Sequence, residues 1–110
     1  MRKIHISGKI TGLSKTNYMD RFKRAEKKMI DEGYSVINPA KVNSQLPSDT
    51  TYEEYMSMSM IMLSMCDSIY MLNNWKDSAG ARKEHQYAVN HEYRVIYEKE
   101  GDNGKTKEKE

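Results

Sequence analysis

Residues 3–12 read KIHISGKITG, a pattern typical of the first strand and the following loop of an α/β domain. The segment 2–7 (RKIHIS) is short and contains β-branched, apolar isoleucines. A glycine follows it, which predicts a strand that ends in a turn. Residues 8–12 (GKITG) form a loop with a glycine at each end. A helix is expected from about residue 15 to residue 32, because four apolar residues recur at helical spacing before the next glycine. These residues are Tyr18, Phe22, Ala25 and Met29.

The rest of the chain continues the alternation of strands and helices. Three more strands are predicted, at 34–38 (YSVIN), 68–72 (SIYML) and 94–97 (RVIY). Residues 39–50 are expected to be a polar loop, after which Thr50-x-x-Glu53 has the spacing of a capping box that opens a helix to about Cys66. A last helix is expected from about Gly80 to His91.

The order βαβαβαβ predicts an α/β domain with a parallel sheet and right-handed crossovers. In such a sheet, a ligand binds beyond the carboxyl ends of the strands, at the point where the strand order reverses. If the order is 2-1-3-4, that point lies between the first and third strands. It is then flanked by the loops 8–13 and 73–79.

Length and composition favour one small domain in a reducing compartment. With 110 residues, we expect one domain over 1–98, and a disordered charged tail over 99–110 that has nothing to bury. A net charge of +2 with interleaved signs gives no reason to expect nucleic-acid binding. The single cysteine excludes an internal disulfide, and no apolar run approaches the ~18 residues of a membrane span. A cytoplasmic location is therefore expected.

Two loops carry residues suited to binding an anion or a sugar. Between Gly8 and Gly12, free backbone N–H groups can point at a phosphate or sugar oxygen, and Lys9 and Thr11 add a charge and a hydroxyl. The alternative is an ordinary turn between a strand and a helix.

The second loop is Ser78-x-Gly80-x-x-x-Glu84, which puts a hydroxyl and a glycine at a helix start. Glu84 follows about one turn later and faces the same crevice. A carboxylate beside an apolar pocket can act as a nucleophile or general base at an anomeric carbon. The alternative is a glutamate that only complements the helix dipole.

Five motifs follow one another along the chain: KIHISGKITG at 3–12, VINP at 36–39, YEEYM at 52–56, CDSIYML at 66–72 and W-x-x-S-x-G-A-x-x-E-H at 75–85. Together they resemble the nucleoside 2-deoxyribosyltransferase-like family, in particular its short and often phage-encoded branch. The resemblance implies a Rossmann-like, flavodoxin-like three-layer sandwich, here with a four- to five-stranded parallel sheet. It also implies cleavage of the N-glycosidic bond of a nucleoside or nucleotide, without a cofactor.

The resemblance also implies roles for individual residues. Glu84 matches the nucleophile. Ser78 and Gly80 match contacts on the phosphate side. Gly8, Ile10 and Gly12 match the loop that wraps the sugar and phosphate. Beside them, Ser7 and Lys9 are also expected to bind the ligand.

Two positions depart from the family pattern. His5 stands where a tyrosine commonly steadies the glutamate; it can hydrogen-bond the carboxylate, pair with it as a cation, or be an ordinary core residue. Ser59 stands where an aspartate often positions the sugar, and a serine is no general acid at neutral pH. These changes are expected to weaken turnover more than binding.

The helix 52–66 is rich in methionine and apolar all round, which predicts burial on every side. We therefore expect a homodimer or higher homo-oligomer through this helix. The resemblance also implies that residues of a neighbouring subunit complete each pocket. Trp75 stacks on a base or anchors its loop. His85 and His91 form no metal-binding pattern with nearby residues, so no metal is expected.

Two functions remain open at this stage, beside a third alternative in which the chain is a structural oligomer with a vestigial pocket. The first is an N-glycosidase or deoxyribosyltransferase that uses Glu84. The second is a catalytically weakened protein that sequesters a nucleotide, such as an ADP-ribose-derived signal in phage anti-defence.

Overall fold

Four parallel strands form one sheet in the computed structural model, which describes residues 1–99. The strands are β1 (Lys3–Ser7), β2 (Ser35–Ile37), β3 (Ser68–Met71) and β4 (Arg94–Tyr97). Their spatial order is β2-β1-β3-β4, and every neighbouring pair is parallel. The order reverses between β1 and β3, which confirms the expected position of the switch point.

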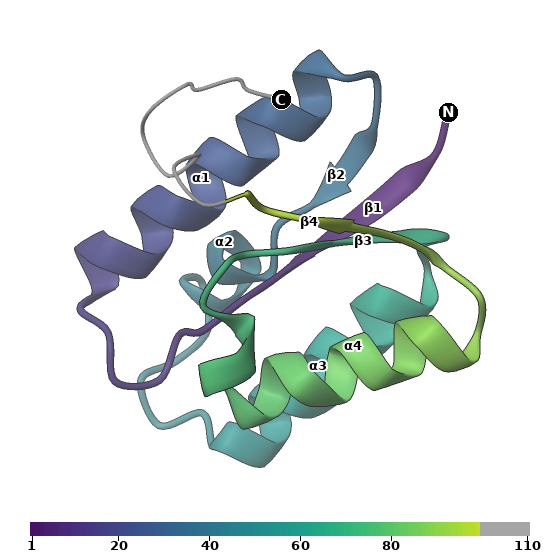
Figure 1. Cartoon of the computed structure of the whole chain (residues 1–110). Helices are drawn as coiled ribbons and strands as arrows, with labels where there is room; N and C mark the ends of the chain where they lie inside the picture. Colours follow the sequence, from purple (N-terminus) through teal and green to yellow (C-terminus); the bar gives the residue numbers. More distant parts are fainter. Residues whose placement is uncertain (100–110) are drawn as a thin grey trace.

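Helices cover both faces of the sheet, as Figure 1 shows. They are α1 (Lys15–Asp31), α2 (Pro39–Asn43), α3 (Tyr52–Ser64) and α4 (Ala79–Asn90), with a short 3₁₀ turn η1 (Trp75–Asp77) before α4. The helix α1 lies on one face, and α3 and α4 lie side by side on the other (Figure 1). The three-layer α/β class is therefore confirmed, with four strands in the described residues.

The alternation of side chains along β1 serves the two faces differently. Ile4 and Ile6 enter the core under α1, which also contains Phe22 and Met29. Ser7 belongs to the opposite set, because successive side chains of a strand point to opposite faces. On that face, β3 packs its own apolar residues against α3 and α4. The polar residues of β1 therefore point toward these two helices.

The segment 39–50, expected to be a polar loop, begins with a short helix instead. The Asn38 side chain accepts hydrogen bonds from the N–H groups of Ala40 and Lys41, at 3.1 and 3.3 Å. Pro39 occupies the first turn, where its missing N–H costs nothing. The loop prediction was wrong over α2, because a helix of this length is too short to have an apolar period.

The capping box of α3 lies one residue later than predicted. Thr51 Oγ1 accepts from the N–H of Glu54 at 3.1 Å, and Glu54 Oε1 accepts from the N–H of Thr51 at 2.9 Å. Thr50 instead donates its hydroxyl to the Pro47 carbonyl at 2.7 Å. That local turn engages Thr50 and leaves the next threonine as the cap.

The single chain does not bury α3 on every side. Leu63 and Ser59 are buried, whereas Ile61 and Met65 are 63% and 54% exposed. The predicted burial on every side included a second subunit, so for the exposed face it stays a prediction. Apart from Lys99, the predicted tail 99–110 lies outside the described residues. Within residues 1–99, no helix has the length and hydropathy to cross a bilayer.

Candidate functional site

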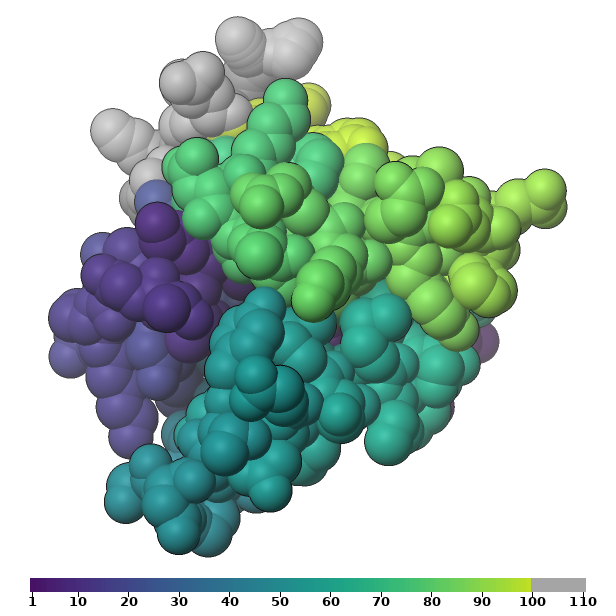
Figure 2. Space-filling view, turned by 90° about the horizontal axis from the view of Figure 1, so that it is seen from below, coloured from purple at the N-terminus to yellow at the C-terminus, as the bar shows by residue number. Residues whose placement is uncertain are grey.

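A cavity opens at the switch point, beyond the carboxyl end of β1, with a volume of about 180 Å³. Figure 2 shows the recess where the N-terminal segment, α3 and α4 meet. The strand β1, the loop after it and all four helices contribute residues. The lining residues are Ile6, Ser7, Gly8, Ile10, Thr11, Tyr18, Phe22, Pro39, Asn43, Tyr52, Tyr55, Met56, Ser59, Ser78, Gly80, Ala81 and Glu84.

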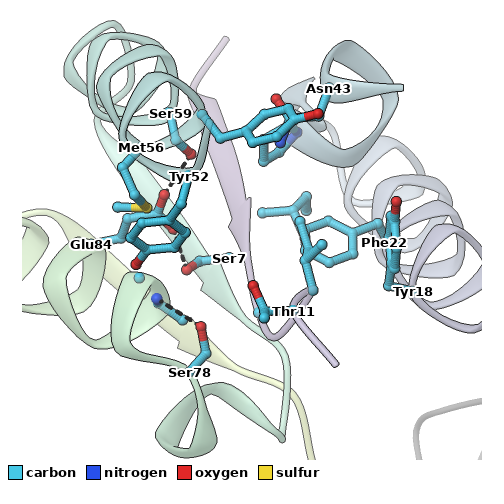
Figure 3. A pocket seen from close by; sticks show the side chains of 17 residues that line it. Ser7, Thr11, Tyr18, Phe22, Asn43, Tyr52, Met56, Ser59, Ser78 and Glu84 are labelled. Carbon is cyan, nitrogen blue, oxygen red and sulfur yellow. Dashed lines mark hydrogen bonds between the residues drawn. The ribbon is translucent and has the colours of Figure 1, made fainter. Parts of the chain in front are cut away.

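The carboxylate of Glu84 is held from two sides in the wall of this cavity (Figure 3). Ser7 donates its hydroxyl to Oε1 at 2.5 Å, and Ser59 donates its hydroxyl to Oε2 at 2.5 Å. His5 Nε2 lies 3.5 Å from Oε2. Glu84 itself is only 5% exposed. Three separate elements, β1, α3 and α4, therefore fix one carboxylate.

The fold explains why these side chains meet. Ser78 is the N-cap of α4, and its hydroxyl accepts from the N–H of Ala81 at 3.1 Å. Glu84 lies six residues after this cap, on the side of α4 that faces β1. Ser7 points to the same side of the sheet, and Ser59 descends from α3. The alternative of a surface glutamate that only complements the helix dipole is excluded by the burial of Glu84.

The surroundings of Glu84 favour its ionised form. Burial alone would raise the pKa of this carboxyl. The nearby His5 imidazole and the hydroxyls of Ser59 and Ser7 outweigh that effect and hold the pKa below its ordinary value. At neutral pH the site therefore presents a desolvated carboxylate rather than a carboxylic acid.

His5 lies behind Glu84 and is absent from the cavity wall. It is fully buried, and within the described chain neither ring nitrogen has a hydrogen-bond partner. Its Nε2 approaches the carboxylate, so the structure combines two of the open alternatives: a core histidine and a partner of the glutamate. From this position, His5 can act on a ligand only through Glu84.

Gly80 supports a close approach of α3 to the start of α4. A Cβ on Gly80 would lie 2.8 Å from Met56 Sδ and 3.3 Å from Tyr52 Oη. The first N–H groups of a helix have no intrahelical partner, and here they adjoin the cavity that Ser78 and Gly80 line. This end of the cavity can therefore accept an anion.

The loop after β1 contributes only part of its predicted residues to the cavity. Gly8 and Ile10 line it, whereas Lys9 and Gly12 do not. A Cβ on Gly8 would come within 2.5 Å of the Leu72 side chain, so this glycine permits close packing of β1 against the end of β3. Gly12 has a φ of +89°, which a glycine adopts without strain.

Trp75 also lies outside the cavity wall. Its ring stacks on His85 with centroids 4.2 Å apart, and the His85 ring nitrogen lies 2.8 Å from the Tyr97 hydroxyl. Of the two roles proposed for Trp75, the structure favours anchoring of the segment before α4. Residues 1–99 contain no group of three or more side chains suited to hold a metal ion.

Several residues of the cavity were not predicted as site residues. Tyr18 and Phe22, whose helical spacing the sequence shows, belong to the core region under α1 and also line the cavity. Tyr52, Tyr55 and Met56 come from the YEEYM motif, which the resemblance did not assign to individual roles. Asn43 belongs to the helix that had been expected to be a loop. No spacing rule in the sequence connects these segments to Glu84.

The fold and the site define a class: a parallel α/β domain with a buried carboxylate in a cavity at its topological switch point. Within this class, the chain belongs to the family described as Domain of unknown function (DUF4406), whose model matches residues 2–97. Among curated proteins, none matches the chain.

Proposed function

We propose that the cavity binds a nucleoside or nucleotide and that Glu84 cleaves or transfers its N-glycosidic bond. The observation that carries the proposal is the carboxylate itself, buried and held by Ser7 and Ser59 in the wall of a cavity. A fixed, ionised carboxylate is what displacement at an anomeric carbon requires of a nucleophile. The resemblance to nucleoside 2-deoxyribosyltransferase-like proteins supports the same role.

The reaction would proceed in two displacements. A Glu84 oxygen attacks C1′ of the sugar, the C1′–N bond breaks, and its electron pair leaves with the base, which takes a proton from water. The glycosyl ester on Glu84 is then opened by water, for hydrolysis, or by a second base, for transfer. Ser7 and Ser59 keep the carboxylate in position throughout both steps.

The chemistry of the cavity suits the parts of a nucleotide. Ser78 and the start of α4 offer hydrogen-bond donors for a phosphate or sugar oxygen. Phe22 and Tyr18 offer apolar rings on the opposite side (Figure 3). The volume of about 180 Å³ is smaller than the roughly 300 Å³ at which typical ligand pockets begin, so part of the ligand would lie outside this single-chain cavity.

One observation favours a second function, nucleotide binding without efficient turnover. Glu84 is the only carboxyl group among the residues that line the cavity in the described chain. Glycosidic cleavage usually employs a second carboxyl as general acid, worth about 10²–10⁴-fold in rate. Ser59, which stands near Glu84, cannot take that role. A protein of this kind would sequester a nucleotide, such as an ADP-ribose-derived signal.

A nucleotide panel separates the two functions. The protein is incubated with deoxynucleosides, their 5′-monophosphates and ADP-ribose; released base is measured by chromatography and binding by thermal shift. Base release that Glu84→Gln abolishes supports the enzyme, with the exposed Glu53→Gln as the matched control. A rise in melting temperature without base release supports sequestration. A ligand at a hundred times its Kd adds about 2.7 kcal/mol to the free energy of unfolding. If no base is released and no nucleotide stabilises the protein, both functions are refuted.

We also propose that the chain forms a homo-oligomer through α3. Ile61 and Met65 lie one helical turn apart, and both are more than half exposed in the single chain. A second copy packed on this face would bury both side chains.

A further inference from the structure

Asn43, the last residue of α2, carries a side-chain amide oxygen without a hydrogen-bond partner in the described part of the chain. This Oδ1 atom is buried, and the residue lines the cavity. A buried acceptor left unsatisfied destabilises the fold, and nearly all such groups in folded proteins find a partner. Because Asn43 borders the cavity, a ligand can supply the missing donor.

The two sides of the cavity differ in chemistry. Glu84, Ser7 and Ser78 lie on one side, whereas Asn43 lies across from them with Phe22 (Figure 3). The first side suits a sugar and an anion. Beside Phe22, the partly buried ring of Tyr18 gives the second side an aromatic surface, which suits a flat heteroaromatic ring that stacks on it and hydrogen-bonds to Asn43 at its edge.

We propose that Asn43 is a specificity-determining residue that reads the edge of the nucleobase. Its Oδ1 accepts an N–H of the base, and its Nδ2 donates to the neighbouring acceptor on the same edge. This inference rests on the proposed function, because it takes the sugar to lie at Glu84. Asn43 then distinguishes ligands that carry a base from sugar phosphates that do not.

The test compares ligands with and without a base. The 5′-monophosphates of the four common deoxynucleosides and 2-deoxyribose 5-phosphate are titrated against the wild type and Asn43→Leu. The Leu variant should bind the preferred nucleotide about tenfold more weakly and bind the sugar phosphate unchanged. Asn17→Leu, on the exposed start of α1, is the matched control and should change neither affinity.

A purely structural role for Asn43 predicts different results. If Asn43 only supported the fold, its replacement would lower the melting temperature of the ligand-free protein. Because Leu removes an unpaired buried acceptor, we instead expect the ligand-free variant to keep or raise its melting temperature. If Leu does not fit, Asn43→Ala removes the same amide without added bulk and is expected to give the same loss of affinity.

Two results would overturn the inference while the proposed function stands. One is wild-type affinity of both Asn43 variants for nucleotides. The other is an equal loss of affinity for nucleotide and sugar phosphate. Failure of the wild type to bind any nucleotide would instead refute the proposed function, and this inference with it.

Discussion

Replacing Ser59 by alanine tests whether the Ser59 hydroxyl holds the carboxylate of Glu84. The hydroxyl of Ser59 donates to Glu84 Oε2 at 2.5 Å, and both residues are buried. A hydrogen bond to a charged group contributes about 1.5–3 kcal/mol. The matched control is Ser64→Ala on the same helix, whose exposed hydroxyl only donates to the carbonyl of Ile61. The control also cancels the gain in helix propensity that alanine brings.

The assay is urea unfolding and thermal melting at several pH values. At pH 7, Ser59→Ala should be about 1.5–3 kcal/mol less stable than Ser64→Ala, or roughly 6–20 °C lower in Tm. Because the pKa of Glu84 is lowered in the folded state, its ionised carboxylate stabilises the fold at pH values above its ordinary pKa of 4.5. This stabilisation is lost as the pH falls through the folded-state pKa. The difference between the variants should therefore narrow in acid.

Two results would refute this reasoning. Equal stabilities of Ser59→Ala and Ser64→Ala at pH 7 would mean that the hydroxyl does not support a charged Glu84. A difference that stays constant from pH 7 into acid would mean that Ser59 contributes by packing alone.

The remaining predictions concern the cavity loop, the oligomer and the aromatic anchor. Gly8→Ala should lower the free energy of unfolding by about 1–3 kcal/mol in urea titration, because its Cβ would overlap Leu72; an unchanged midpoint would contradict the close packing. Ile61→Lys, and likewise Met65→Lys, should reduce the sedimentation coefficient to that of a monomer while the circular dichroism stays unchanged; the same species in wild type and variant would exclude this interface. The fluorescence of Trp75 should not respond to a nucleotide that raises Tm, because its ring packs outside the cavity; strong quenching would instead indicate stacking on the base.

The sequence was sufficient for the order of strands and helices, because their signals are local. The residues before Gly8 predict a strand, and the spacing of Phe22 and Met29 predicts a helix. The side chain of Ser78 caps the helix that follows it. From a βαβ alternation, chain sterics restrict the topology to parallel strands and a known switch point. The address of the cavity followed from these rules. The short helix ending at Asn43 did not, because it has no period to detect.

The cavity lies beside the segment KIHISGKITG, and Glu84 shows how much of this site the sequence alone determines. Its position near the start of a helix could be predicted, but an exposed glutamate has the same local pattern. Only the tertiary structure brings Ser7 and Ser59 to its two oxygens, across 77 and 25 residues of chain. Only the packing of α4 on the sheet makes His5 a neighbour of Glu84, and only the stacking on His85 shows that Trp75 lies outside the cavity wall. The spacing of residues along one element is fixed by backbone geometry, whereas contacts between elements depend on how their faces pack.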